Sequence, residues 1–322
     1  MRRITFLTGA VLAFALAGLL VACSSPAAKP EDSTLKMGLL PITDILPFHV
    51  AEQEGFFQEQ GITVEFIPVK SAQERDTLMQ TGQIDGELTD LMSVGLFNKE
   101  EARIKVVCTA RRAYADSPMF RILAAPGSDI NSVQDLKGVE IGISQNTIIE
   151  YLTDRLLEAE GLSPEEIAVQ EVSQIPVRFE LLMRGQIQAA TLPDPLASGA
   201  VAAGANVLVD DSTHTDFAQS VLAFSTDALE AKPNTVKKFL KAWEKAAAAI
   251  NENPQKYQNL LIEKGRVPES IQGTYAMPPF PEASVPTEAQ WQDVVDWLIG
   301  KGLIEKPVPF DSAVDDSFLP GA

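Results

Sequence analysis

The sequence is poor in cysteine and histidine. Its 322 residues include two of each. Two cysteines, Cys23 and Cys108, are too few for a disulfide scaffold or a multi-cysteine metal cluster. The two histidines, His49 and His214, lie in no Cys/His/carboxylate cluster with the spacing of metal ligands. We therefore predict no metal site and no cofactor, and we expect Cys108 to be a buried cysteine in a strand.

Basic side chains are also scarce. The chain has 26 Lys and Arg against 44 Asp and Glu, a formal net charge of -18. This field repels phosphate backbones and anionic headgroups, which excludes a sequence-independent nucleic-acid binder. The sequence shows no Gly-rich phosphate loop, nucleophile elbow or metal signature of an enzyme. Its 45% hydrophobic content is that of a globular protein, and its length suits one large or two medium domains.

The longest apolar run lies at the N-terminus. A short basic start precedes Ile4 to Leu20, and Leu20-Val21-Ala22-Cys23 follows. This resembles the lipobox of bacterial lipoprotein signal peptides, which implies cleavage of residues 1–22 and lipidation of Cys23. The alternative is an uncleaved anchor, because the run is about as long as the ~20 residues that span a bilayer. With lipidation, residues 23–34 form a flexible tether of an extracytoplasmic protein anchored to the cell membrane.

An internal repeat organises the remaining chain. Residues 35–41 (LKMGLLP) and 139–144 (VEIGIS) each predict a strand that leads into a helix, and a second strand follows each of them. The phrases around Gly82 and Gly185 both continue as Gly-Gln-Ile, and these two glycines lie 103 positions apart. The alternation of strands and amphipathic helices predicts two α/β units with mostly parallel sheets.

Two later helices have clear apolar faces. The first presents Val236, Phe239, Leu240, Trp243 and Ile250 at helical spacing. The second begins at a Thr287…Gln290 capping box and presents Trp291, Val294, Val295 and Leu298. We interpret these tryptophans as core residues rather than as a ligand cage.

Three segments carry a resemblance to a known family. They are residues 51–62 (AEQEGFFQEQGI), residues 132–138 (SVQDLKG) and residues 293–303 (DVVDWLIGKGL). In this order behind a lipobox, they resemble the substrate-binding proteins of ABC importers, in the branch that binds sulfonates, thiamine precursors and riboflavin. The resemblance implies a type II periplasmic-binding-protein fold: two α/β lobes, each a mixed, mostly parallel sheet flanked by helices. Two crossing strands join the lobes, which close on a small ligand.

The resemblance also implies domain bounds and partners. Lobe 1 would comprise residues 35–122 and, with the C-terminal helices, residues 219–322, and lobe 2 would comprise residues 123–218. The crossing strands would lie near Phe120–Pro126 and Phe217–Ser220. The implied partners are a small-molecule solute, the permease and ATPase subunits of the importer, and the membrane through Cys23. We expect a monomer that makes and breaks no bond, since the chain lacks the cysteine-rich motif of the related thiamine-pyrimidine enzymes.

Candidate ligand-binding residues follow from the position of the loops. In open α/β sheets, ligands bind beyond the carboxyl ends of strands and beside helix N-termini. The residues at such positions are Asp44, Phe48, Ser71, Asp90, Arg112, Tyr114, Asn146, Thr147 and Asp194.

Most of these residues have a structural alternative. Asp44 can simply cap a helix, as can Asn146 or Thr147. Asp194 can shape a turn, and Phe48 can face the core. Arg112 follows Arg111 at a strand end, where its fork suits a sulfonate, a phosphate or paired carbonyl oxygens, unless it forms a surface ion pair.

The carboxylates among the predicted site residues indicate which class of ligand the cleft would bind. Several of them around a cleft disfavour a small anion through repulsion, whereas the aromatic, amide and carboxylate candidates suit a flat heterocycle. The sequence therefore favours riboflavin or a thiamine-precursor pyrimidine. The alternative is an alkanesulfonate, taurine or a nitrate-like anion, held by Arg112 and the N-terminus of the helix that begins at residue 148.

Overall fold

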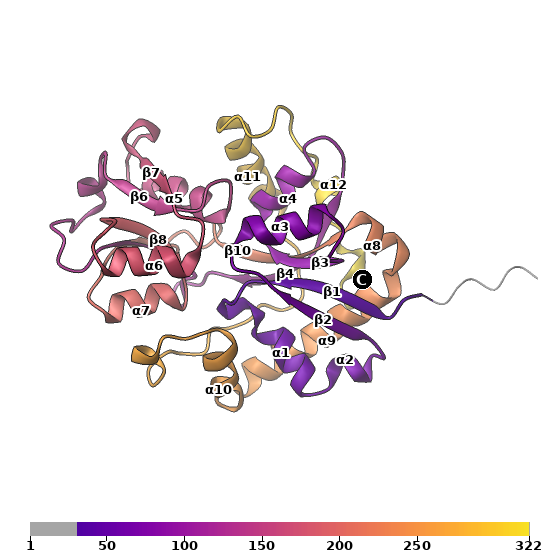
Figure 1. The fold of residues 1–322 in the computed structure, drawn as a ribbon. Helices are drawn as coiled ribbons and strands as arrows, with labels where there is room; N and C mark the ends of the chain where they lie inside the picture. Colours follow the sequence, from indigo (N-terminus) through magenta and orange to yellow (C-terminus); the bar gives the residue numbers. More distant parts are fainter. Residues whose placement is uncertain (1–30, 322) are drawn as a thin grey trace, which may run out of the picture. The chain divides into compact units, whose positions relative to one another are not determined.

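The computed structural model describes residues 31–321, and the chain from Asp32 onward forms one compact unit. It contains two five-stranded sheets, with the strand orders β2-β1-β3-β10-β4 and β7-β6-β8-β5-β9 (Figure 1). We call the sheets with their helices lobe 1 and lobe 2. The predicted fold of two α/β lobes is confirmed.

Three parallel strands form one side of the lobe 1 sheet. Strand β1 lies between β2 and β3 and is parallel to both, whereas β10 is antiparallel to β3 and β4. Its strands are β1 (Thr34–Leu39), β2 (Thr63–Pro68), β3 (Gly86–Thr89), β4 (Ile104–Arg112) and β10 (Gln219–Ser225). Cys108 of β4 is buried, as predicted, and burial raises the pKa of its thiol to about 12.

Lobe 2 repeats this pattern. Strand β6 is parallel to β7 and β8, and β5 is antiparallel to β8 and β9. Its strands are β5 (Phe120–Ala124), β6 (Glu140–Ile143), β7 (Ala168–Glu171), β8 (Ala189–Pro193) and β9 (Asn206–Asp210). Its helices are η2 (Val133–Leu136), α5 (Ile148–Ala159), η3 (Pro164–Glu166), α6 (Ile175–Met183) and α7 (Leu196–Ala202).

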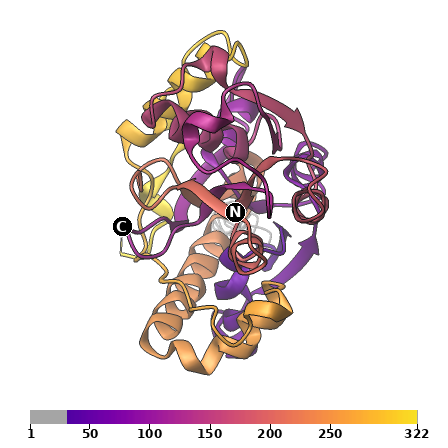
Figure 2. The same ribbon diagram turned by 90° about the vertical axis from the view of Figure 1, so that its left-hand side faces the viewer.

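The helices of lobe 1 cover both faces of its sheet (Figures 1 and 2). On one face α3 (Ala72–Gln80), α4 (Leu91–Phe97) and α11 (Glu288–Gly300) share a core. On the other face α1 (Leu46–Gln53), α2 (Phe56–Glu59), α9 (Pro233–Glu252) and α10 (Pro254–Lys264) share another. The shorter elements are η1 (Thr43–Ile45), α8 (Thr226–Ala231), η4 (Glu269–Ile271), α12 (Phe310–Ala313) and η5 (Asp316–Phe318).

The two predicted helix faces are confirmed. All five apolar residues predicted for the first helix are buried in α9, and all four predicted for the second are buried in α11. Trp243, Trp291 and Trp297 are each no more than 4% exposed, so the tryptophans are core residues. The Thr287…Gln290 capping box is present at the start of α11.

The internal repeat has a steric basis. A Cβ on Gly38 would lie 2.8 Å from Ile84 Cδ1, and a Cβ on Gly142 would lie 2.7 Å from Ile187 Cδ1. Each glycine lets the apolar side chain that follows the Gly-Gln pair pack directly against the first strand of its lobe. The same local packing therefore recurs in both lobes.

Residues 113–119 and 211–218 connect the two sheets within the described chain. Asp211 joins the two connections, because its carboxylate accepts the backbone N–H groups of Met119 (2.9 Å) and Phe120 (3.0 Å). The predicted crossing stretch 120–126 contains β5 instead. Lobe 2 therefore begins at Phe120, earlier than the predicted residue 123, because Phe120–Ala124 pairs in register with β8.

Helix α11 bonds lobe 2 through its polar face. Asp293 accepts hydrogen bonds from Tyr151 Oη (2.5 Å) and Arg155 Nε (3.1 Å) of α5. One and two turns later, Trp297 Nε1 and Lys301 Nζ both donate to Asp154, at 2.9 and 3.1 Å. The third segment of the family resemblance, residues 293–303, thus forms a clasp between the lobes.

Candidate functional site

A cavity of about 60 Å³ lies between the two sheets and is lined from both lobes. The loops that line it follow the carboxyl ends of strands, where ligands of open α/β sheets bind. Its charged lining residues are Asp44, Arg75, Asp90 and Arg178. Its apolar walls include Leu40, Ile42, Leu88, Phe120, Ile148 and Ile175.

A second, more apolar cavity of about 200 Å³ adjoins the first. The two share Leu40 and Ile42 of lobe 1 with Ile175 and Pro193 of lobe 2. The second cavity is also lined by Lys70, Asp194 and Arg266. We call the first the inner cavity and the second the outer cavity, and together they form one cleft between the lobes.

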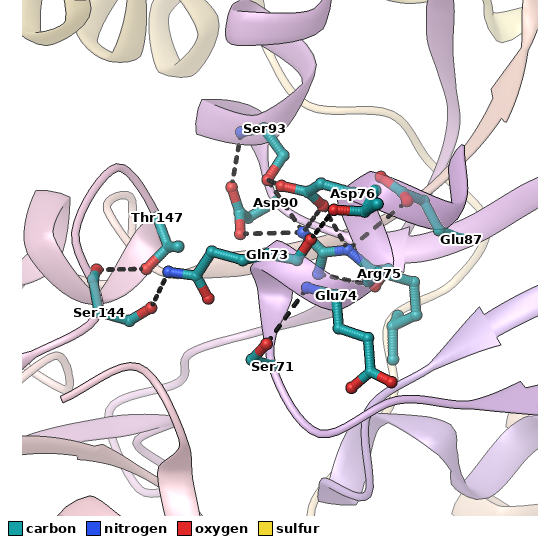
Figure 3. A network of polar contacts seen from close by, with 12 residues as sticks. Ser71, Gln73, Glu74, Arg75, Asp76, Glu87, Asp90, Ser93, Ser144 and Thr147 are labelled. Carbon is teal, nitrogen blue, oxygen red and sulfur yellow. Dashed lines mark hydrogen bonds and ion pairs between the residues drawn. The ribbon is translucent and has the colours of Figure 1, made fainter. Parts of the chain in front are cut away.

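Arg75 occupies the lobe 1 side of the inner cavity (Figure 3). Its guanidinium donates to Asp76 Oδ1 (2.9 Å), Leu88 O (3.1 Å) and Ser93 Oγ (2.9 Å). It also lies within ion-pair distance of Glu87 (3.6 Å) and Asp90 (3.9 Å). Burial alone would lower the pKa of Arg75, but these carboxylates raise it. The positive charge of Arg75 is therefore already compensated by neighbouring carboxylates.

Two of these acids carry raised pKa values. Burial raises the pKa of Glu87 to about 8, against the opposing charge of Arg75. Burial also raises the pKa of Asp90, again opposed by Arg75. Asp90 caps α4, since its Oδ1 accepts the Ser93 N–H at 2.9 Å. The carboxylates on this side of the cleft are therefore either partnered or biased towards protonation.

Asp44 is also partnered. Its carboxylate accepts a bond from Arg111 Nη1 at 3.0 Å and one from Ser220 Oγ at 2.6 Å. All three side chains are buried, and the N-cap residues of η1 and α1 make no side-chain cap bond. Asp44 thus holds an ion pair beside the cavity and caps neither helix.

The N-terminus of α5 forms the lobe 2 wall. Thr147 is its N-cap: its Oγ1 donates to Ser144 O (2.8 Å) and accepts the Ile149 N–H (3.2 Å). Asn146 is exposed and left-handed, with φ 59°. Gln73 Nε2 of α3 donates to Ser144 Oγ at 3.0 Å, which links the lobes across the cavity (Figure 3).

Arg178 of α6 is the cation on the lobe 2 side. Its Nε donates to Thr191 O (2.9 Å) and its Nη1 to Val172 O (2.7 Å). Its Nη2 is buried and has no hydrogen-bond partner among the described residues. Burial lowers the pKa of Arg178 to about 10, which leaves the side chain protonated at neutral pH.

Asp194 lies at the outer cavity. Its Oδ1 accepts bonds from Arg121 Nη1 and from Ser198 Oγ (2.9 Å), and Tyr275 Oη lies 3.4 Å from its Oδ2. The Asp194–Pro195 peptide bond is cis. Asp194 therefore combines the predicted turn with a buried polar cluster that reaches lobe 1 through Tyr275.

The other predicted site residues lie elsewhere. Phe48 is fully buried in the lobe 1 core, with its ring centroid 4.8 Å from that of Trp243, so it does not face the cleft. Phe48 lies in α1 and packs against α9. Arg112 is exposed and lies over the Tyr114 ring at 5.0 Å, and neither residue lines a cavity described above. Ser71 caps α3 by accepting the Glu74 N–H at 3.2 Å, next to the cavity residue Ala72.

Sequence reasoning missed the three buried arginines Arg75, Arg111 and Arg178. A signal for two of them existed, because Arg75 and Arg178 lie 103 positions apart, like Gly82 and Gly185. For Arg111 the signal was weaker, since β4 is buried on both faces from Val106 to Arg111.

Cys23, the predicted lipidation site, lies outside the described residues. Within residues 31–321, we find no helix with the length and apolar character needed to cross a membrane.

The cleft between two α/β lobes defines the class of the protein, a two-lobed fold of the periplasmic-binding-protein type. The chain belongs to the NMT1/THI5-like family, whose sequence profile matches residues 42–257. It is 24% identical over 324 residues to the riboflavin-binding protein RibY of Chloroflexus aurantiacus, covering 93% of this chain and 90% of that protein.

Solved structures support the same fold. The alkanesulfonate-binding protein SsuA from Xanthomonas axonopodis pv. citri, bound to MOPS, superposes with a TM-score of 0.74 at 19% identity, covering 89% of this chain and 99% of that one. The desulfurization enzyme DSZB superposes with a TM-score of 0.63 at 17% identity, covering 89% and 97%. The fold thus occurs in both binding proteins and an enzyme, and the site has to indicate the function.

Proposed function

We propose that the protein is the extracytoplasmic substrate-binding protein of an ABC importer. It captures a small solute between its lobes and delivers it, unchanged, to the permease and ATPase subunits. The observation that carries this proposal is the cavity lined by both lobes, because a site divided in this way couples ligand capture to the relative position of the lobes. The similarity to RibY over 93% of the chain supports the same function.

The proposed ligand is a heterocyclic vitamin-type solute, riboflavin or a thiamine-precursor pyrimidine. RibY is named as a riboflavin-binding protein, and the apolar outer cavity suits a ring system. The inner and outer cavities, at about 60 and 200 Å³, lie below the ~300–1,000 Å³ of typical ligand pockets. Riboflavin would therefore require the lobes to move apart before it binds.

The second candidate is an alkanesulfonate, taurine or a nitrate-like anion. It is favoured by the unpartnered Nη2 of Arg178 and by the state of the cleft acids. Asp44 is bonded to Arg111, and Asp90 caps α4 and lies 3.9 Å from Arg75. The repulsion that carboxylates would exert on an anion is thus weaker than the sequence suggested.

We propose that the mature protein is a monomer held at the membrane by lipid on Cys23. The Leu-Val-Ala-Cys sequence supports this anchor. Mass spectrometry of the membrane-associated protein would detect the acylated N-terminal Cys23.

A thermal-shift panel tests the ligand. The purified protein is heated with riboflavin, the thiamine aminopyrimidine, taurine, pentanesulfonate or nitrate. A ligand at about 100 times its Kd adds ~2.7 kcal/mol of stability, which raises the Tm by about 5 °C for a chain of this size. We expect riboflavin or the pyrimidine to give this shift. A shift with sulfonates alone would establish the second candidate instead, and a chemical change in a bound probe would contradict the capture function.

A further inference from the structure

Arg75 and Arg178 occupy equivalent positions in the two lobes. They lie 103 residues apart, and so do the residues Leu88 and Thr191 whose carbonyl groups they bond. Arg75 Nη1 donates to Leu88 O at 3.1 Å, and Arg178 Nε donates to Thr191 O at 2.9 Å. Both side chains are at most 2% exposed, and both line the inner cavity. The repeat has therefore placed one buried arginine on each side of the cleft.

Their electrostatic surroundings differ. The three acids beside Arg75 are Asp76, Glu87 and Asp90. The residues 103 positions after these acids are Phe179, Ala190 and Pro193. Among the described residues, no carboxylate lies within ion-pair distance of Arg178. Glu171 has an electrostatic effect on it, but the Oε2 of Glu171 accepts the Gln145 N–H at 2.7 Å.

The Nη2 group of Arg178 makes no hydrogen bond among the described residues. Val172 directly follows β7, so its accepting carbonyl lies at the carboxyl end of that strand. Thr191 is the central residue of β8, two residues before its carboxyl end. The neighbouring residues Ser173 and Pro193 line the inner cavity with Arg178. A buried polar group without a partner is destabilising, and more so when it is charged. Nη2 is thus a buried cationic donor, on a side chain that lines the inner cavity, with no acceptor among the described residues.

We propose that Arg178 anchors the solute, with Nη2 donating to an acceptor oxygen on the compact polar group of the ligand. This rests on the proposed function and adds a chemical requirement. The solute must carry a ring-carbonyl oxygen or a sulfonate-type oxygen at the end that enters the inner cavity. Arg75 does not take this role, because each of its three nitrogens already has an acceptor. These acceptors are the Asp76 carboxylate, the Leu88 carbonyl and the Ser93 hydroxyl. Arg178 is therefore a specificity-determining residue.

The test compares three variants by calorimetric titration: Arg178→Met, Arg178→Lys and the control Arg112→Met. Arg112 is exposed and lies outside the cavity, so its variant should bind like the wild type. The probes are riboflavin, pentanesulfonate and nitrate, which separate a ring carbonyl from an anionic oxygen. A hydrogen bond to a charged group is strong enough that its loss weakens binding ~10- to 100-fold. We expect this loss in Arg178→Met and a smaller loss in Arg178→Lys.

Arg178→Met should fold, because it removes a buried charge that has no counter-ion. Arg178→Lys keeps the charge and provides the test if the Met variant does not fold. If the wild type binds a probe and Arg178→Met binds it as tightly, the anchoring role is wrong while the capture function stands. The thiamine aminopyrimidine, which has no ring carbonyl, is titrated as a fourth probe. If the wild type binds it and none of the other three, the acceptor-oxygen requirement is wrong while the capture function stands. If the wild type binds none of the four, the requirement fails together with the proposed ligands.

Discussion

At the scale of residues, the site is organised by buried charges and by the groups that match them. In lobe 1 each carboxylate near the cavity either meets a cation or carries a raised pKa. Asp44 meets Arg111, and Glu87, opposed by Arg75, has a pKa that burial raises to about 8. A carboxyl with this pKa takes up a proton on folding, because its ordinary value is near 4.5. Its effect on stability must therefore depend on pH.

The Glu87→Gln variant tests this dependence. The pKa of Glu87 is higher in the folded state than in the unfolded state, so its contribution is fully present below pH ~4.5 and is lost as pH rises to ~8. Glutamine keeps the shape without titrating. We expect the variant to gain stability relative to the wild type as pH rises from 5 to 9, by a few kcal/mol at most. Urea unfolding at several pH values measures this, with exposed Glu305→Gln as the control. Parallel curves for wild type and Glu87→Gln would contradict the raised pKa.

The sequence predicted the positions of the site residues more accurately than it predicted their hydrogen-bond partners. Asp44, Asp90 and Thr147 were predicted from strand ends, and all three line the inner cavity. The sequence could not show that Asp44 meets Arg111, since the two are 67 residues apart. It selected Arg112 rather than Arg111. The two are adjacent in β4 and point to opposite sides, and the structure buries Arg111 and leaves Arg112 exposed.

At the scale of elements, apolar faces could be predicted and polar faces could not. The periodicity of residues 291–298 identified the buried face of α11. The opposite face bonds α5 through Asp293, and its partner Tyr151 is 142 residues away in sequence. No local pattern encodes such a contact. The segment 293–303 was predicted as a family feature, and the structure adds that it clasps the two lobes.

The Asp293→Ala variant tests the clasp. It removes the acceptor for the largely buried Tyr151 hydroxyl and for Arg155. We expect a loss of about 1–3 kcal/mol in the free energy of unfolding, since buried donors are left without partners. The matched control is Asp296→Ala on the same helix, where the exposed Asp296 is bonded by Gln292 at 2.8 Å. Urea denaturation measures both, and equal losses would show that α11 does not hold α5 through Asp293.

At the scale of the whole molecule, two short connections carry the chain between the sheets, and Asp211 joins them. Its side chain is fully buried and accepts two backbone N–H groups, that of Met119 at the end of the first connection and that of Phe120 at the start of β5. Burial raises the pKa of Asp211 to about 7, against these two bonds. The neighbouring Asp210, the last residue of β9, instead accepts the N–H of Ser212 two residues later, at 3.0 Å. Asp211 therefore makes bonds that join the two connections, whereas the adjacent Asp210 makes a local bond only.

This contrast gives a prediction about lobe movement. Asp211→Ala leaves the N–H groups of Met119 and Phe120 without their acceptor, which should cost about 2–6 kcal/mol of stability at ~1–3 kcal/mol for each group. Because both groups lie where the chain enters lobe 2, small-angle scattering should also give a larger radius of gyration than for the wild type. Asp210→Ala should lose less than ~1 kcal/mol and keep the wild-type radius. If the two variants agree in stability and in radius, Asp211 does not tie the connections, and other contacts, such as those of α11 and Gln73, hold the lobes together.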